Sequence, residues 1–155
     1  MNIFVLDEDP VKSAQMQCDK HVVKMVLETA QLLCSVYDKA PYRRTHYNHP
    51  CAIWTRTSLA NYKWLIEHGR ALAEEYKLRY GKEHASKIVI EWCAVELRDN
   101  PPTFIQNSNV LTNFAQAMPE NLRHKNAVVA YRTYYKKAKS EIAKWSHVRQ
   151  QPNWW

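Results

Sequence analysis

Glycine is almost absent from this chain of 155 residues, in which only Gly69 and Gly81 occur. Tight turns and strand bulges depend on glycine, and long stretches here lack any turn signal, which argues against a many-stranded β fold. With 46% hydrophobic and 24% charged residues, the chain can still build a substantial core. We therefore predict an all-α fold: one compact domain, residues 1–155, of three to four main helices with long ordered connections.

Several signatures of function are also missing. No CxxC spacing, glycine-rich phosphate loop or Ser-His-Asp element occurs, and the cysteines are expected to stay thiols in a reducing cytosol. The apolar start lacks the basic leader and cleavage site of a signal peptide. We expect a cytoplasmic protein without membrane contact, cofactor or metal. Two spacings, Cys18-x-x-His21 and His46-x-x-His49-x-Cys51, would suit a metal ion but have no supporting ligand pair.

Positive charge is in excess and is interleaved with aromatic residues. The formal net charge is +7, and the pattern is concentrated in residues 42–47 and 131–137. Cations bind phosphates with release of counterions and aromatic faces stack on bases, so the pattern favours a nucleic-acid partner. A basic protein with ordinary core tyrosines would show the same composition. The candidate contacts in these segments are Arg43, Arg44, His46, Tyr47, Lys136 and Lys137.

Turn signals divide the chain into its expected elements. Helices are expected at 10–37, with a break near Cys18, and at 50–80, 86–97 and 126–145. The run Ile88-Val89-Ile90 taken alone would also suit a strand. The remaining residues are expected to form a polar loop at 38–49 and an extended connection at 98–126.

The first expected helix carries a single line of polar groups on an otherwise apolar surface. At 100° per residue, a strip roughly 80° wide holds Gln17, His21, Lys24, Glu28 and Gln31. Burying ions costs several kcal/mol each unless they pair or line a wet cleft. Two explanations stay open: an internal ion pair between Lys24 and Glu28, or an active-site cleft with Glu28 at its centre.

The triplet Asp19-Lys20-His21, followed seven residues later by Glu28, resembles a segment of the pyrimidine-dimer DNA glycosylases. In that family a D-x-H triplet precedes an indispensable glutamate by the same interval. The resemblance continues at 50–53 and 62–81, which are similar to the family's second long helix. Residues 151–155 are similar to its R-P-T-W-Y segment, whose aromatics pack near bound DNA. Roughly half of the chain is covered, and the resemblance implies a DNA duplex with a damaged or modified pyrimidine as substrate.

The sequence departs from the family pattern at its reactive amine. The family's nucleophile is the α-amine of a threonine exposed by removal of methionine, whereas residue 2 here is Asn, which normally leaves Met1 in place. Leu27 and Gln31 stand where the family has arginines, and the segment before His21 is several residues longer.

Glycosidic cleavage builds positive charge on the sugar, so a carboxylate under C1′ stabilises that charge and can afterwards take a proton from C2′. Glu28 is predicted to fill this role. A lyase would also need a neutral amine to attack C1′, and the candidates are Met1 and Lys24. His21 is expected to reach Glu28 through water or to contact a phosphate. A core histidine with a backbone partner is the structural alternative.

We therefore predict a monomeric DNA base-excision enzyme, a glycosylase with or without lyase activity. Such an enzyme extrudes a nucleotide, so Trp154 and Trp155 are candidates to fill the gap, and Lys20 is a further candidate DNA contact. One alternative is a phage-type transferase that modifies DNA bases on the same fold. The other is a non-catalytic nucleic-acid-binding protein, in which Glu28 only pairs with Lys24.

Overall fold

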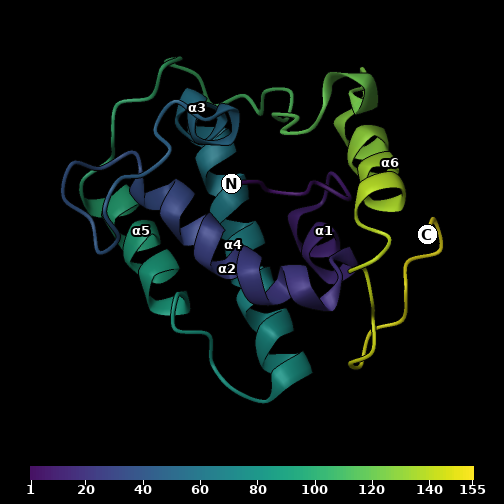
Figure 1. Ribbon diagram of the computed structural model, residues 1–155. Coiled ribbons are helices and arrows are strands. Elements are labelled where there is room, and N and C mark those ends of the chain that lie inside the picture. The colour runs from purple at the N-terminus through teal and green to yellow at the C-terminus, as the bar shows by residue number, and fades with distance from the viewer.

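The computed structural model describes residues 1–155 and contains helices but no strand (Figure 1). The helices are α1 (Pro10–Met16), α2 (Asp19–Cys34), α3 (Pro50–Thr57), α4 (Leu59–Tyr80), α5 (Lys87–Asp99), the 3-10 helix η1 (Glu120–Leu122) and α6 (Ala127–Ala138). Four of them, α2, α4, α5 and α6, have 12 residues or more. The all-α prediction is confirmed. None of these helices has the length and apolar character needed to cross a membrane.

The 22-residue helix α4 is the centre of the fold, because α1, α2, α3 and α5 all pack against it. In Figure 1, α2 crosses in front of α4, α5 lies on one side, and α6 with the C-terminus lies on the other. Gly69 allows the close approach of α2 and α5 to α4. A Cβ there would lie 2.8 Å from Thr29 Cγ2 and 3.0 Å from Ile90 Cδ1.

The N-terminal segment, residues 3–6, forms no helix and is buried. It pairs with no strand, so side chains of α1 and the residue after it satisfy its backbone. The Gln17 amide donates to two of its carbonyls at 2.9 and 3.3 Å, and the Ser13 hydroxyl accepts the N–H of Leu6 at 3.0 Å. These bonds hold the start of the chain against α1.

The expected break in the first helix occurs, with Gln17 and Cys18 separating α1 from α2. Gln17 therefore does not share a helix with His21 and Glu28. The prediction that five polar residues form one strip on one helix is wrong for Gln17. The apolar surface of this helix is not buried all round, because Val23 and Leu27 are 41% and 39% exposed. The packed faces of α2 are those against α3, α4 and α5, and one face remains open to solvent.

The second long helix is broken at Ser58, which has extended backbone angles of φ −143° and ψ 158°. The hydroxyl of Ser58 accepts the N–H of Asn61 at the start of α4 and donates to the carbonyl of Val110 at 2.8 Å. The connection at 98–126 crosses here, and its N–H groups of Ile105 and Gln106 bond to carbonyls at the end of α3. The break at Ser58 thus provides hydrogen-bonding groups to which the connection at 98–126 binds.

The last helix ends at Ala138, not near residue 145 as expected. The following residues leave the helix because they bond to the start of α2. The N–H of Asp19 donates to the carbonyl of Lys144 at 2.9 Å, and the N–H of Ser146 donates to the Asp19 carboxylate at 2.7 Å. The run at residues 88–90 is helical, as part of α5, and is not a strand.

Candidate active site

A hollow of about 500 Å³ opens between the N-terminal segment, α2, the start of α3 and the end of α6. We call it the Glu28 hollow. Its lining residues are Met1, Asn2, Phe4, Lys20, His21, Lys24, Met25, Glu28, His49, Pro50, Ala117, Tyr134, Lys139 and Ile142. The four predicted catalytic residues, and Lys20 from the predicted DNA contacts, therefore lie around one cavity.

Glu28 is 7% exposed and is held from two sides. Its Oε2 accepts the N–H of Asn2 at 2.9 Å and lies 3.9 Å from the α-amine of Met1. Its Oε1 lies 3.3 Å from Nζ of Lys24, whose side chain is 68% exposed. The ion pair and the cleft, which the sequence offered as alternatives, are thus both present. A fixed backbone donor orients the carboxylate before any ligand enters.

Asn2 anchors the N-terminus beside Glu28. Its side-chain amide donates to the carbonyl of Ala117 at 2.8 Å, while its Oδ1 accepts the N–H of Ile3 and the hydroxyl of Tyr131. The residue is 8% exposed, so these bonds replace those to water. Together they fix the position of the Met1 amine in the hollow.

His21 is 5% exposed, and its ring stacks on Phe4 with the centroids 4.1 Å apart. Its Nδ1 lies 2.5 Å from the hydroxyl of Tyr135, so its partner is a side chain and not the backbone. Burial, with Lys139 and Lys24 as weaker causes, lowers the pKa of His21 to about 3. The imidazole is therefore neutral at pH 7 and acts as a hydrogen-bonding group.

Sequence reasoning missed several residues of the Glu28 hollow, chiefly His49, Tyr134 and Lys139. His49 caps α3, where its Nδ1 accepts the N–H of Cys51 at 3.1 Å, and burial lowers its pKa. In the sequence it signalled only a helix start and part of a metal-like spacing. Tyr134 and Lys139 come from the far end of the chain, and no spacing in the sequence connects them to Glu28.

The predicted DNA contacts of loop 38–49 lie on the surface, away from the lining of the Glu28 hollow. Arg43 and His46 are exposed. Arg44 pairs with Asp38 at 3.0 Å, and its guanidinium lies 4.6 Å from the ring centroid of Tyr47. Arg56 of α3 also lies over Tyr47, 3.8 Å from its ring centroid, so cation–π and ion-pair contacts order this loop.

The predicted contacts near the C-terminus fall into two groups. Lys136 and Lys137 are exposed on the last turn of α6. The two tryptophans are half-buried against the end of α1: Trp154 Nε1 lies 3.4 Å from Met16 Sδ, and Trp155 packs edge-on against Trp145. Neither tryptophan lines the Glu28 hollow.

The two metal-like spacings serve other contacts. Cys18 is buried beneath the hydroxyl of Tyr135, and His21 bonds to the same hydroxyl. His49 bonds to the backbone of Cys51. The structure contains no group of three or more His, Cys, Asp or Glu side chains arranged to hold a metal ion.

Asp19, the first residue of the D-x-H triplet, serves the structure and does not line the hollow. Its carboxylate pairs with the fully buried guanidinium of Arg79 at 3.1 Å and accepts the N–H and the hydroxyl of Ser146. The hydroxyl of Tyr80 donates to its carbonyl at 3.3 Å. Two separate parts of the sequence pattern, the triplet and residues 79–81, are thus joined in one buried cluster.

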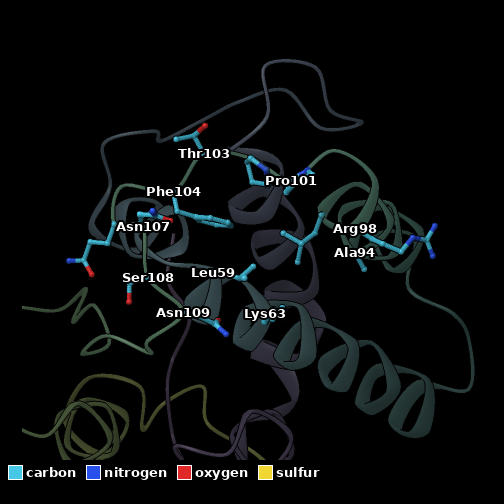
Figure 2. A pocket seen from close by; sticks show the side chains of 13 residues that line it. Leu59, Lys63, Ala94, Arg98, Pro101, Thr103, Phe104, Asn107, Ser108 and Asn109 are labelled. Carbon is cyan, nitrogen blue, oxygen red and sulfur yellow. The ribbon is translucent and has the colours of Figure 1, made fainter.

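A second cavity, of about 790 Å³, lies between the start of α4, the end of α5 and residues 101–109. Figure 2 shows the ring of Phe104 pointing into it, whereas Arg98 points away. Arg98 pairs with Asp99 at 2.8 Å. No carboxylate, histidine or cysteine lines this cavity, so it lacks the acid–base groups that the Glu28 hollow contains.

Comparison with known proteins gives one family match. Residues 1–89 match the protein family described as pyrimidine dimer DNA glycosylase. The match includes the N-terminal segment, α2 and His49, but not Tyr134 or Lys139. No curated protein and no solved structure matches the chain. Because the match covers more than half of its residues, the chain belongs to the pyrimidine dimer DNA glycosylase family.

Proposed function

We propose that this protein is a DNA base-excision enzyme acting on a damaged or modified pyrimidine, with Glu28 as its central catalytic residue. The observation that carries the proposal is a buried, oriented carboxylate with two amines at 3.9 and 3.3 Å, in a hollow of about 500 Å³. Hollows of this size accommodate small ligands. A nucleotide extruded from the duplex would bring its C1′ to Glu28.

In the glycosylase step, the bond between C1′ and the base breaks and the base leaves with the electron pair. Positive charge then grows on the sugar, and the Glu28 carboxylate stabilises it until a water molecule forms a bond to C1′ and gives up a proton, which the departing base takes up. The low exposure of Glu28 strengthens this effect, because little water screens the charge. The neutral imidazole of His21 adds no competing positive charge at the sugar.

In a lyase step, a neutral amine forms a bond to C1′ as the base departs, and the nitrogen then loses a proton. The bond between C1′ and O4′ breaks next, O4′ takes the electron pair and a proton, and an imine results. Glu28 then takes a proton from C2′, and the phosphate at C3′ leaves with the electron pair. We favour the Met1 amine over Lys24 as the nucleophile. Asn2 holds Met1 in place through three side-chain bonds, whereas the Lys24 side chain is 68% exposed.

The base-modifying transferase is the second candidate. The observation that favours it is the anchored Asn2, which keeps Met1 where the family has an N-terminal threonine. The Glu28 hollow and its carboxylate would then serve a group transfer to the base. This candidate predicts binding of duplexes with 5-substituted pyrimidines without base release.

The deciding experiment compares the wild type, Glu28→Gln and the control Glu67→Gln on ultraviolet-irradiated and 5-substituted-pyrimidine duplexes, with base release and strand scission followed in parallel. Glu67 is exposed on α4 and lies outside the Glu28 hollow. We expect Glu28→Gln to lose roughly 10²–10⁴-fold in turnover while DNA affinity is retained, because the shape stays and the charge is removed. Glu67→Gln should match the wild type. Equal turnover in Glu28→Gln would refute the role of Glu28.

Borohydride trapping on abasic DNA tests the lyase step separately. A covalent adduct that persists in Lys24→Gln and maps to the N-terminal peptide would support Met1 as the nucleophile. An adduct lost in Lys24→Gln alone would assign it to Lys24. Base release with no adduct would leave a glycosylase without lyase activity.

A further inference from the structure

Four cationic groups line the Glu28 hollow, but Glu28 is the only carboxylate among its lining residues. The Met1 amine and Lys24 lie 3.9 and 3.3 Å from Glu28 and share its single negative charge. The other two cations, Lys20 and Lys139, have no carboxylate within 4.0 Å. A hollow with this excess of positive charge attracts an anionic group of its ligand.

Lys139 is held in position although it has no counterion. Its backbone N–H donates to the carbonyl of Tyr135 at 3.0 Å, and its own carbonyl accepts the N–H groups of Ile142 and Ala143 at 3.0 and 2.8 Å. These bonds fix the turn that follows α6. The root of the side chain therefore has a defined place at the edge of the hollow.

Aromatic rings hold the ammonium group of Lys139. Its Nζ lies 5.0 Å from the ring centroid of Tyr134 and 5.9 Å from that of Phe4. Phe4 stacks between His21, at 4.1 Å and 22°, and Tyr134, at 6.1 Å and 19°. Phe4 adopts this place with a positive φ of 56°, a strained conformation for an aromatic residue. The surroundings thus orient a free cation in advance, which reduces the conformational entropy lost on binding an anion.

We propose that Lys139 binds a backbone phosphate next to the extruded nucleotide and so positions the sugar over Glu28. The proposal rests on the proposed function and adds a positioning residue from α6, outside the part of the chain that matches the family. The ligand group is a phosphodiester. Lys139 contributes its charge and hydrogen bonds and takes no part in bond breaking.

The test measures binding to a duplex with a tetrahydrofuran abasic site, which cannot form an imine and therefore stays intact. Methylphosphonate replaces, one at a time, each phosphate that flanks the site. The variants are Lys139→Gln, Lys139→Arg and the control Lys82→Gln, whose lysine is exposed beyond the end of α4. Thermal unfolding of each variant verifies that it folds.

We expect Lys139→Gln to bind roughly 10-fold more weakly at low salt and to reduce the slope of log K against log salt by about one. One methylphosphonate should weaken the wild type by a similar factor but have no further effect on Lys139→Gln. Lys139→Arg should recover most of the affinity, and Lys82→Gln should match the wild type. On a cleavable duplex, KM should rise more than kcat falls.

The outcomes separate this inference from the proposed function. If the wild type binds no duplex, both are overturned. If the wild type binds and Lys139→Gln shows the same affinity and the same methylphosphonate profile, only the role of Lys139 is overturned. A loss that is equal on every duplex, with all methylphosphonate effects retained, also overturns it.

Discussion

Replacing Arg79 by methionine removes the cation at the centre of the cluster that joins α4 to the junction of α1 and α2. The guanidinium is fully buried and pairs with Asp19 at 3.1 Å and with Glu75 at 3.0 Å. It also donates to the carbonyls of Gln15 and Gln17, at 3.0 and 2.8 Å. The variant leaves two buried carboxylates and two carbonyls without this partner.

The expected loss in the free energy of unfolding is about 3–5 kcal/mol, the usual cost of breaking a buried ion pair from one side. The loss is not larger because Ser146 still donates to Asp19 and Arg149 still pairs with Glu75 at 2.6 Å. Arg70 is the matched control, since it lies on the same helix and pairs with Glu91 at 2.7 Å, but is 48% exposed. Arg70→Met should cost less than about 1 kcal/mol.

Urea denaturation at pH 7 measures both variants against the wild type, with the slope m compared to verify that the same unfolding is observed. In thermal unfolding, Arg79→Met should lower Tm by roughly 6–20 °C, since 1 kcal/mol corresponds to about 2–4 °C at this chain length. If the two variants differ by less than about 1 kcal/mol, burial does not decide the strength of these ion pairs and the reasoning fails.

Two further predictions concern stability. Burial lowers the pKa of His21 to about 3 and of His68 to about 4, so below about pH 6.5 the unfolded chain takes up protons that the folded chain does not. The free energy of unfolding should therefore decrease as pH falls from 6.5 toward 4, by about 1.4 kcal/mol per pH unit for each histidine. Urea denaturation at pH 7, 6 and 5 measures this decrease. A free energy of unfolding that stays constant over these pH values would contradict the prediction. Gly69→Ala should destabilise the protein by roughly 1–2 kcal/mol in the same assay. The added Cβ would lie 2.8 Å from Thr29 Cγ2, and the cost of this steric clash exceeds the gain from the better helix propensity of alanine. A stabilised Gly69→Ala variant would show that the three helices separate without cost.

Local patterns predicted the helical character of the chain and most helix starts. Proline after a capping residue opens both α1, after Asp9, and α3, after His49, and Gly81 ends α4 with a φ of 71°. These are effects of neighbouring residues, so the sequence contains them. The break at Ser58 and the early end of α6 depend on bonds to residues far along the chain, such as Val110 and Asp19. No local pattern encodes such bonds.

The sequence by itself determined that His21, Lys24 and Glu28 share one side of a helix, because a period of 3.6 residues requires it. Only the tertiary structure decided that Lys24 stays exposed, that the Met1 amine lies 3.9 Å from Glu28, and that Lys139 completes the hollow. The physical reason is that burial and charge proximity depend on how helices pack in space. That packing is set jointly by contacts between distant residues, and spacing along the chain does not report it.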